Sequence, residues 1–110
     1  MKSWIGLALI LLLAIGTPVL LAQKGDAAAG KAVYDKRCAT CHGAAGEGKE
    51  AIAKMFKVEM HALASKEVQA LSDADLRKVV GEGKGKMVAV KGLSGKEMAN
   101  LIAYVRSLKK

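Results

Sequence analysis

The chain has 110 residues, enough for one small domain, and its 18 lysines and arginines against 10 acidic residues give a formal net charge of +8. Such a charge is typical of proteins that bind nucleic acid, a membrane surface or an acidic protein partner. Nucleic acid is not the expected partner, because no motif interleaves aromatic side chains with basic ones and only 4% of the residues are aromatic.

The N-terminal segment Met1–Ala22 predicts an export signal peptide. Lys2 supplies the positive charge, Leu7–Ile15 forms an unbroken apolar run, and Pro18 breaks the segment before its end. Export would place the rest of the chain in the periplasm or in another exported compartment, such as one resembling a thylakoid lumen.

Retention of this segment as a membrane anchor is the alternative. Leu20 stands where a preferred signal-peptidase site has a small residue. The 19 uncharged residues of Trp4–Ala22 are also long enough to span a bilayer. In either case the folded domain is expected to comprise residues 23–110.

The first helix of the domain is expected over residues 26–37. Asp26 is a favourable N-cap, and apolar residues recur at helical spacing along one face. That face contains Ala29, Val33 and Tyr34. Gly30 costs about 1 kcal/mol in a helix relative to alanine, so either another backbone approaches it closely or the glycine is simply tolerated.

Residues Cys38-Ala39-Thr40-Cys41-His42 spell C-x-x-C-H, the attachment motif of a c-type haem. Two thiols on about one helical turn can each add to a vinyl group of the same porphyrin, and the adjacent imidazole can bind its iron. A disulfide between Cys38 and Cys41 would be strained and would leave His42 without a role. A thioredoxin-like pair needs a βαβ context, and zinc needs about four ligands, where only His42 and His61 could join the thiols. The motif therefore predicts one haem c, bound covalently through Cys38 and Cys41 with His42 on the iron.

The remainder of the chain predicts short helices and loops, with no alternating run long enough for a sheet. Helices are expected over residues 49–57, in a short turn after Ser65, over 72–81 and over 94–108. The last helix is the best supported, because Ser94-Gly95-Lys96-Glu97 is a full capping box. The apolar faces would contain Ile52, Met55 and Phe56 in the helix over 49–57, and Met98, Leu101, Ile102, Val105 and Leu108 in the last helix. The fold class is therefore all-α.

The ligand on the second face of the iron decides whether the protein carries electrons or binds a small molecule. The candidates are Met55, Met60, His61, Met87 and Met98. Met55 and Met98 belong to apolar helix faces, where core packing explains them. Met60 and His61 lie in a stretch without periodicity and stay open as rivals. Met87 lies in a glycine-rich segment between two helices, outside any apolar face, and is the favoured ligand.

The chain resembles the small class I bacterial cytochromes c over residues 26–108. The resemblance rests on Gly30 and Tyr34 in the first helix, Cys38 to His42, Leu71 to Leu76, Gly83-Lys84-Gly85-Lys86-Met87 and Leu101-Ile102-Ala103-Tyr104-Val105. It implies a monomer whose bundle of about four to five helices wraps around one haem, with the N- and C-terminal helices crossing. It also implies that Gly30 and Tyr34 pack against the last helix, and that Met87 is the axial methionine.

Two prolines that are common in this family are missing. Val88 follows Met87, where the family often has proline, and the loop after the haem motif has none, since Pro18 is the only proline of the chain. The first difference implies a less rigid Met87 loop, and the second leaves the carbonyl partner of the His42 ring unidentified.

The resemblance implies a one-electron carrier between redox complexes outside the cytoplasm, and not an enzyme. Lysines could steer docking to acidic surfaces of redox partners. They include Lys31, Lys49, Lys57, Lys84, Lys86 and Lys91. The alternatives are a gas-binding or peroxide-reactive haem protein in which Met87 is labile, and a haem domain anchored to a membrane complex.

Overall fold

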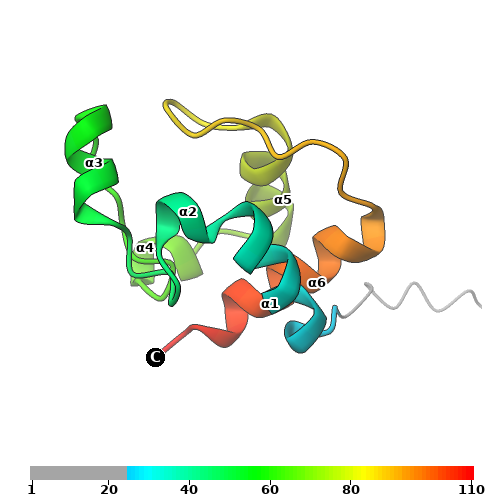
Figure 1. The fold of residues 1–110 in the computed structure, drawn as a ribbon. Helices are drawn as coiled ribbons and strands as arrows, with labels where there is room; N and C mark the ends of the chain where they lie inside the picture. The colour runs from blue at the N-terminus through cyan, green and yellow to red at the C-terminus, as the bar shows by residue number, and fades with distance from the viewer. Residues whose placement is uncertain (1–24) are drawn as a thin grey trace, which may run out of the picture.

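The computed structural model describes residues 25–110, and the expected signal peptide or anchor lies outside this part (Figure 1). The helices of the described part are α1 (Ala27–Arg37), α2 (Ala39–His42), α3 (Glu50–Phe56), α4 (Lys66–Gln69), α5 (Asp73–Glu82) and α6 (Gly95–Ser107). A single isolated bridge between Lys84 and Met87 is the only β-type pairing among these residues. None of the six helices is long and apolar enough to cross a membrane. The predicted all-α class is confirmed.

Helix α1 begins where the sequence predicts it. The Asp26 side chain accepts a hydrogen bond from the Ala28 main-chain N–H at 2.9 Å and so caps the helix. Tyr34 is fully buried and Val33 is partly buried, but Ala29 is exposed. The buried face of α1 is therefore narrower than expected, and a single large aromatic side chain dominates it.

Helix α6 is the central element of the core. Ser94 and Glu97 form both hydrogen bonds of the predicted capping box, each 3.1 Å long. One side of α6 places Leu101 and Tyr104 against Tyr34, with the two tyrosine rings 5.0 Å apart between centroids. The other side joins residues of α6 and α5 in a second cluster, which contains Leu76, Ile102 and Val105.

The first and last helices cross, and they form the most extensive helix pair of the described part (Figure 1). Gly30 is what permits this close approach, because a Cβ built on it would lie 1.8 Å from the Asn100 carbonyl oxygen. The buried Asn100 side chain in turn accepts a hydrogen bond from the Asp26 main-chain N–H at 2.8 Å. Of the two roles considered for Gly30, close backbone approach is the one that the structure confirms.

Arg106 fixes the turn between α4 and α5 to the last helix. Its guanidinium lies 2.9 Å from the Asp73 carboxylate and donates to the Gln69 carbonyl oxygen at 2.8 Å. The Gln69 amide nitrogen donates to the carbonyl oxygens of Leu63 and Val105 at 2.8 and 2.9 Å. Local sequence patterns do not predict these contacts, because most partners of Arg106 and Gln69 are distant in the chain.

Helix α3 stands apart from the other helices in Figure 1. It ends at Phe56, and the following residue, Lys57, caps it in the left-handed conformation with a φ of 54°. Its expected apolar face is only partly covered, since Ile52 is half-buried whereas Met55 is 63% exposed and Phe56 is also exposed. The apolar periodicity predicts this helix correctly. It does not predict that the rest of the domain leaves much of the apolar face of α3 exposed.

Candidate functional site

The C-x-x-C-H segment forms one helical turn directly after α1. The Cys38 main-chain N–H donates to the Tyr34 carbonyl oxygen at 2.8 Å, and the His42 N–H donates to the Cys38 carbonyl oxygen at 3.0 Å. Cys38 is half-buried, Cys41 is exposed, and both are free thiols. The predicted spacing of the two thiols on about one turn is therefore confirmed by the local backbone.

His42 is half-buried, which distinguishes it from a surface histidine. Burial lowers the pKa of its imidazole, so the ring is neutral near pH 7 and keeps a free lone pair. Its Nδ1 atom is buried and has no hydrogen-bond partner in the described part of the chain. A neutral imidazole beside two free thiols is the donor set that a covalently attached haem requires, so these residues fit the group.

The loop after His42 is closed by main-chain contacts and by Glu47, a residue that the sequence analysis passed over. The Gly48 N–H donates to the His42 carbonyl oxygen at 2.7 Å, which folds the chain back over the turn. Glu47 Oε2 accepts from the Ala45 N–H at 2.9 Å. Hydrogen bonds from its own main-chain N–H and from that of Ala45 lower the pKa of the Glu47 carboxyl. These contacts close the loop after the C-x-x-C-H motif, in which the family that the sequence resembles commonly has a proline.

Tyr34 ties the core to this loop. Its hydroxyl donates to the carbonyl oxygen of Gly43, the residue that follows the haem motif. Burial raises the pKa of the hydroxyl to about 12, so it remains a donor across the physiological range. The aromatic ring that α1 buries against α6 therefore also fixes the end of the C-x-x-C-H turn.

Met87 lies in a hairpin between α5 and α6, drawn in yellow in Figure 1, where the hairpin tip points toward the side on which α3 stands. Lys84 and Met87 exchange main-chain hydrogen bonds of 3.0 and 2.9 Å, which close the tip. Gly83 has a φ of 81°, and a Cβ there would lie 2.6 Å from the Met87 carbonyl oxygen, so this position requires glycine. Met87 itself is half-buried.

The rival ligands occupy other surroundings. Met98 packs in the core cluster of Leu76, Ile102 and Val105. The Met60 sulfur lies 3.6 Å from where a Cβ on Gly48 would stand, so the side chain packs against the backbone of that loop. Met55 and His61 are exposed. Packing thus explains the positions of Met60 and Met98, whereas Met55 and His61 are exposed to solvent.

Comparison with known proteins extends over nearly the whole described part. The family model for cytochrome c matches residues 27–109. The chain is 37% identical over 91 residues to cytochrome c-554(547) of Halothiobacillus neapolitanus, an alignment covering 77% of this chain and 99% of that protein. A solved structure, the KustC0563 c-type cytochrome, is similar with a TM-score of 0.63 and 30% identity, covering 74% of this chain and 98% of that one. The matched range includes both the C-x-x-C-H turn and the Met87 hairpin.

Proposed function

Since this chain belongs to the cytochrome c family, we propose that it is a monohaem one-electron carrier between redox complexes outside the cytoplasm. Cys38 and Cys41 would hold a haem c through thioether bonds, and His42 and Met87 would bind its iron. The haem supplies a one-electron redox centre. The protein supplies two strong-field axial donors and excludes small molecules from the iron, as expected of a carrier and not of an enzyme.

The observation that carries this proposal is the setting of Met87. Its hairpin is closed by the Lys84–Met87 hydrogen bonds and requires Gly83, whereas packing or exposure describes each rival side chain. A thioether is a soft, neutral donor that favours ferrous iron, so ligation by His42 and Met87 raises the reduction potential. With His42 and Met87 both bound, the iron would offer no open position to small molecules, as a one-electron carrier requires.

The test is the optical spectrum of the reduced protein with and without carbon monoxide. We expect a low-spin spectrum that carbon monoxide leaves unchanged over minutes, because Met87 already occupies the position that the gas would take. Prompt and complete binding of carbon monoxide to the unmodified protein contradicts the carrier function. It would favour the second candidate, a gas-binding or peroxide-reactive haem protein, for which the exposed Val88 in the place of proline is the supporting observation.

We also propose that the redox partners present acidic docking surfaces. The six lysines singled out from the sequence are all exposed, and two of them, Lys84 and Lys86, precede Met87 in its hairpin. Lys31 contributes least, because its ammonium lies 2.8 Å from the Asp35 carboxylate. Electron transfer to an acidic partner should slow as the ionic strength rises, because salt screens exposed charges. A rate independent of salt between about 10 mM and 0.5 M, measured by stopped flow, would exclude this steering.

Export of the domain is part of the same proposal. A cleaved signal would leave a chain beginning near Gln23, whereas an anchor would retain Trp4–Ala22. Mass spectrometry of the mature protein distinguishes the two, because they differ by the mass of the whole segment.

A further inference from the structure

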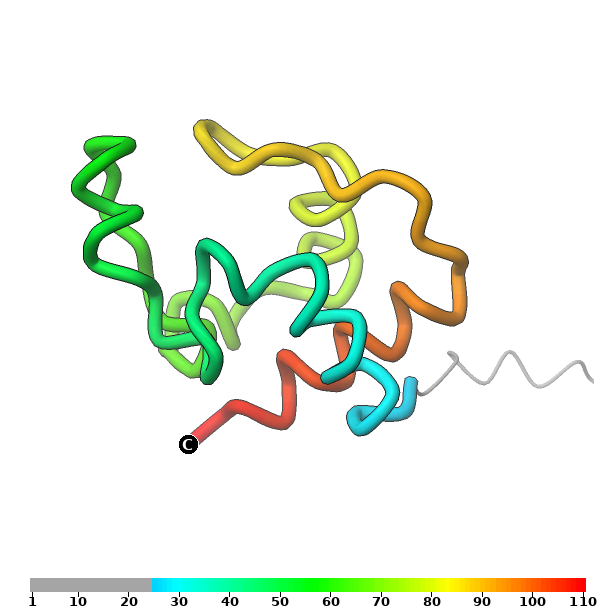
Figure 2. The backbone as a smooth tube through the Cα atoms, viewed as in Figure 1, coloured from blue at the N-terminus to red at the C-terminus, as the bar shows by residue number. Residues whose placement is uncertain are grey.

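Arg37 connects the two parts of the proposed iron site. It is the last residue of α1 and directly precedes Cys38. Its Nη2 atom donates a hydrogen bond of 2.8 Å to the carbonyl oxygen of Lys91, 54 residues further along the chain. Lys91 lies in the segment that follows Met87 and leads to α6 (Figure 2). A single side chain thus joins the helix that leads into the C-x-x-C-H turn to the loop that carries Met87.

The other hydrogen bonds of this loop are to α5 or within the loop itself. The Val90 N–H donates to the Val80 carbonyl oxygen at 2.8 Å, and the Lys91 ammonium donates to the Gly81 carbonyl oxygen at 3.4 Å. These bonds fix the loop to the helix before it. In the described part of the chain, the bond from Arg37 is the only hydrogen bond that joins α1 or α2 to residues 83–92.

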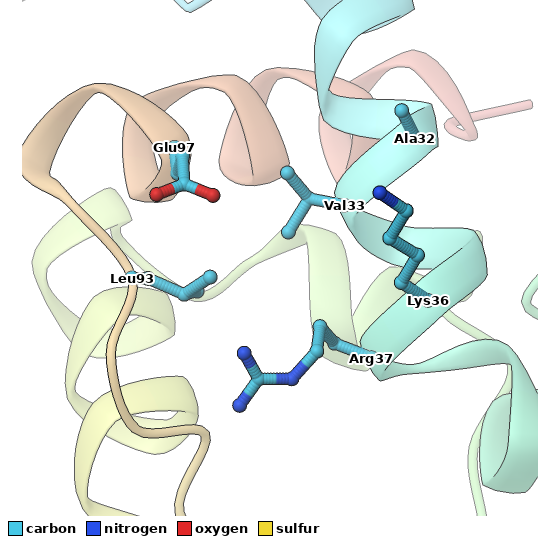
Figure 3. A pocket seen from close by; sticks show the side chains of 6 residues that line it. All are labelled: Ala32, Val33, Lys36, Arg37, Leu93 and Glu97. Atoms are coloured by element: carbon cyan, nitrogen blue, oxygen red, sulfur yellow. The ribbon is translucent and has the colours of Figure 1, made fainter.

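The Arg37 side chain is held where it can make this contact. It lines a pocket of about 160 Å³ together with Ala32, Val33, Lys36, Leu93 and Glu97. Figure 3 shows the guanidinium reaching from α1 toward the segment that carries Leu93, with the Glu97 carboxylate on another side of the pocket. Apolar side chains that line the same pocket can cover the stem of Arg37, which favours this position of the side chain.

The Met87 loop has a flexible backbone, which such a contact can stiffen. Gly83, Gly85 and Gly92 all have positive φ and add backbone freedom, while Val88 is 80% exposed and contributes little packing. Stiffness must therefore come from hydrogen bonds to the rest of the protein. We propose that Arg37 is a positioning residue that sets how firmly Met87 is held at the iron. This role rests on the proposed ligation by Met87.

The test is the binding of imidazole to the ferric, full-length holoprotein. An external ligand binds only the fraction of molecules in which the methionine is detached, so its apparent affinity reports that fraction. We expect Arg37→Gln to bind imidazole about two- to fivefold more tightly, which lies within the range for an exposed charged interaction. Hydrogen exchange in peptides spanning residues 84–91 should also become faster.

Two further variants separate positioning from other effects. Arg77→Gln removes the same charge from an exposed position of α5 that makes no hydrogen bond to residues 83–92, and should leave the imidazole affinity unchanged. In a Met87→Ala background, Arg37→Gln should have no effect on imidazole binding, because there is no methionine left to position. Equal affinities of Arg37→Gln and the unmodified protein overturn the proposal, as does an undiminished effect in the Met87→Ala background. If Met87→Ala alone leaves the spectrum and the imidazole affinity unchanged, the proposed ligation itself is wrong.

Discussion

Replacing Met87 with alanine is expected to convert the protein from one that excludes carbon monoxide to one that binds it completely within seconds in the reduced state. Alanine has no donor atom, so under the proposed ligation the iron would lose Met87 as a ligand. The midpoint potential should fall by on the order of 0.1 V, a fraction of the roughly 0.8 V range over which axial ligands set haem potentials. Optical spectra and a redox titration measure both effects.

Two control variants make this result specific to Met87. Met55→Ala removes a methionine that is 63% exposed on α3 and should change neither the spectrum nor the potential. Met60→Ala removes another candidate for the iron ligand, a methionine that is half-buried like Met87 and packs against Gly48. If Met60→Ala opens the site and Met87→Ala does not, Met60 is the ligand and the hairpin has another role.

Among the variants proposed for this protein, Gly30→Ala is expected to lower the free energy of unfolding the most. In an ordinary helix interior this change would stabilise by about 1 kcal/mol. Here the new Cβ would lie 1.8 Å from the Asn100 carbonyl oxygen, and this atom belongs to the backbone of α6 and cannot rotate away. The two helices would have to separate, which we expect to cost about 3 kcal/mol net. That corresponds to a fall in Tm of about 12–24 °C for a domain of this size.

A matched glycine provides the control. Gly95 opens α6, and a Cβ built on it meets nothing within 4 Å. Gly95→Ala should therefore leave the Tm of the holoprotein unchanged or raise it slightly. If the two variants melt at the same temperature in calorimetry, close approach at Gly30 does not limit stability.

Local sequence patterns predict structure that depends only on contacts between residues close together in the chain. The Asp26 cap, the Ser94–Glu97 capping box and the turn of the C-x-x-C-H motif each depend on residues no more than four positions apart. Such contacts form whenever the segment is helical, so the sequence is sufficient to identify them. Ser72 caps α5 by the same kind of local contact, since its hydroxyl accepts from the Asp75 N–H at 3.0 Å.

Contacts between distant segments could not be predicted in this way. Arg37 and Lys91 are 54 positions apart, and Arg106 meets Asp73 across 33. An exposed arginine in a helix has many possible partners, and its own sequence neighbours do not distinguish them. The partial exposure of the apolar face of α3 could not be predicted for the same reason. Periodicity identifies which residues share a face, but not which other segments pack against that face.

The sequence by itself therefore determined the helices, the haem motif and the resemblance to the cytochrome c family, because each of these depends on short-range spacing. The resemblance implied the close contact at Gly30, but only the tertiary structure decided that Met60 packs against Gly48 and that Arg37 binds the loop carrying Met87. Each of those outcomes requires two segments to meet in space. The position of one segment against another is set by the packing of the whole core around α6 and by no local pattern.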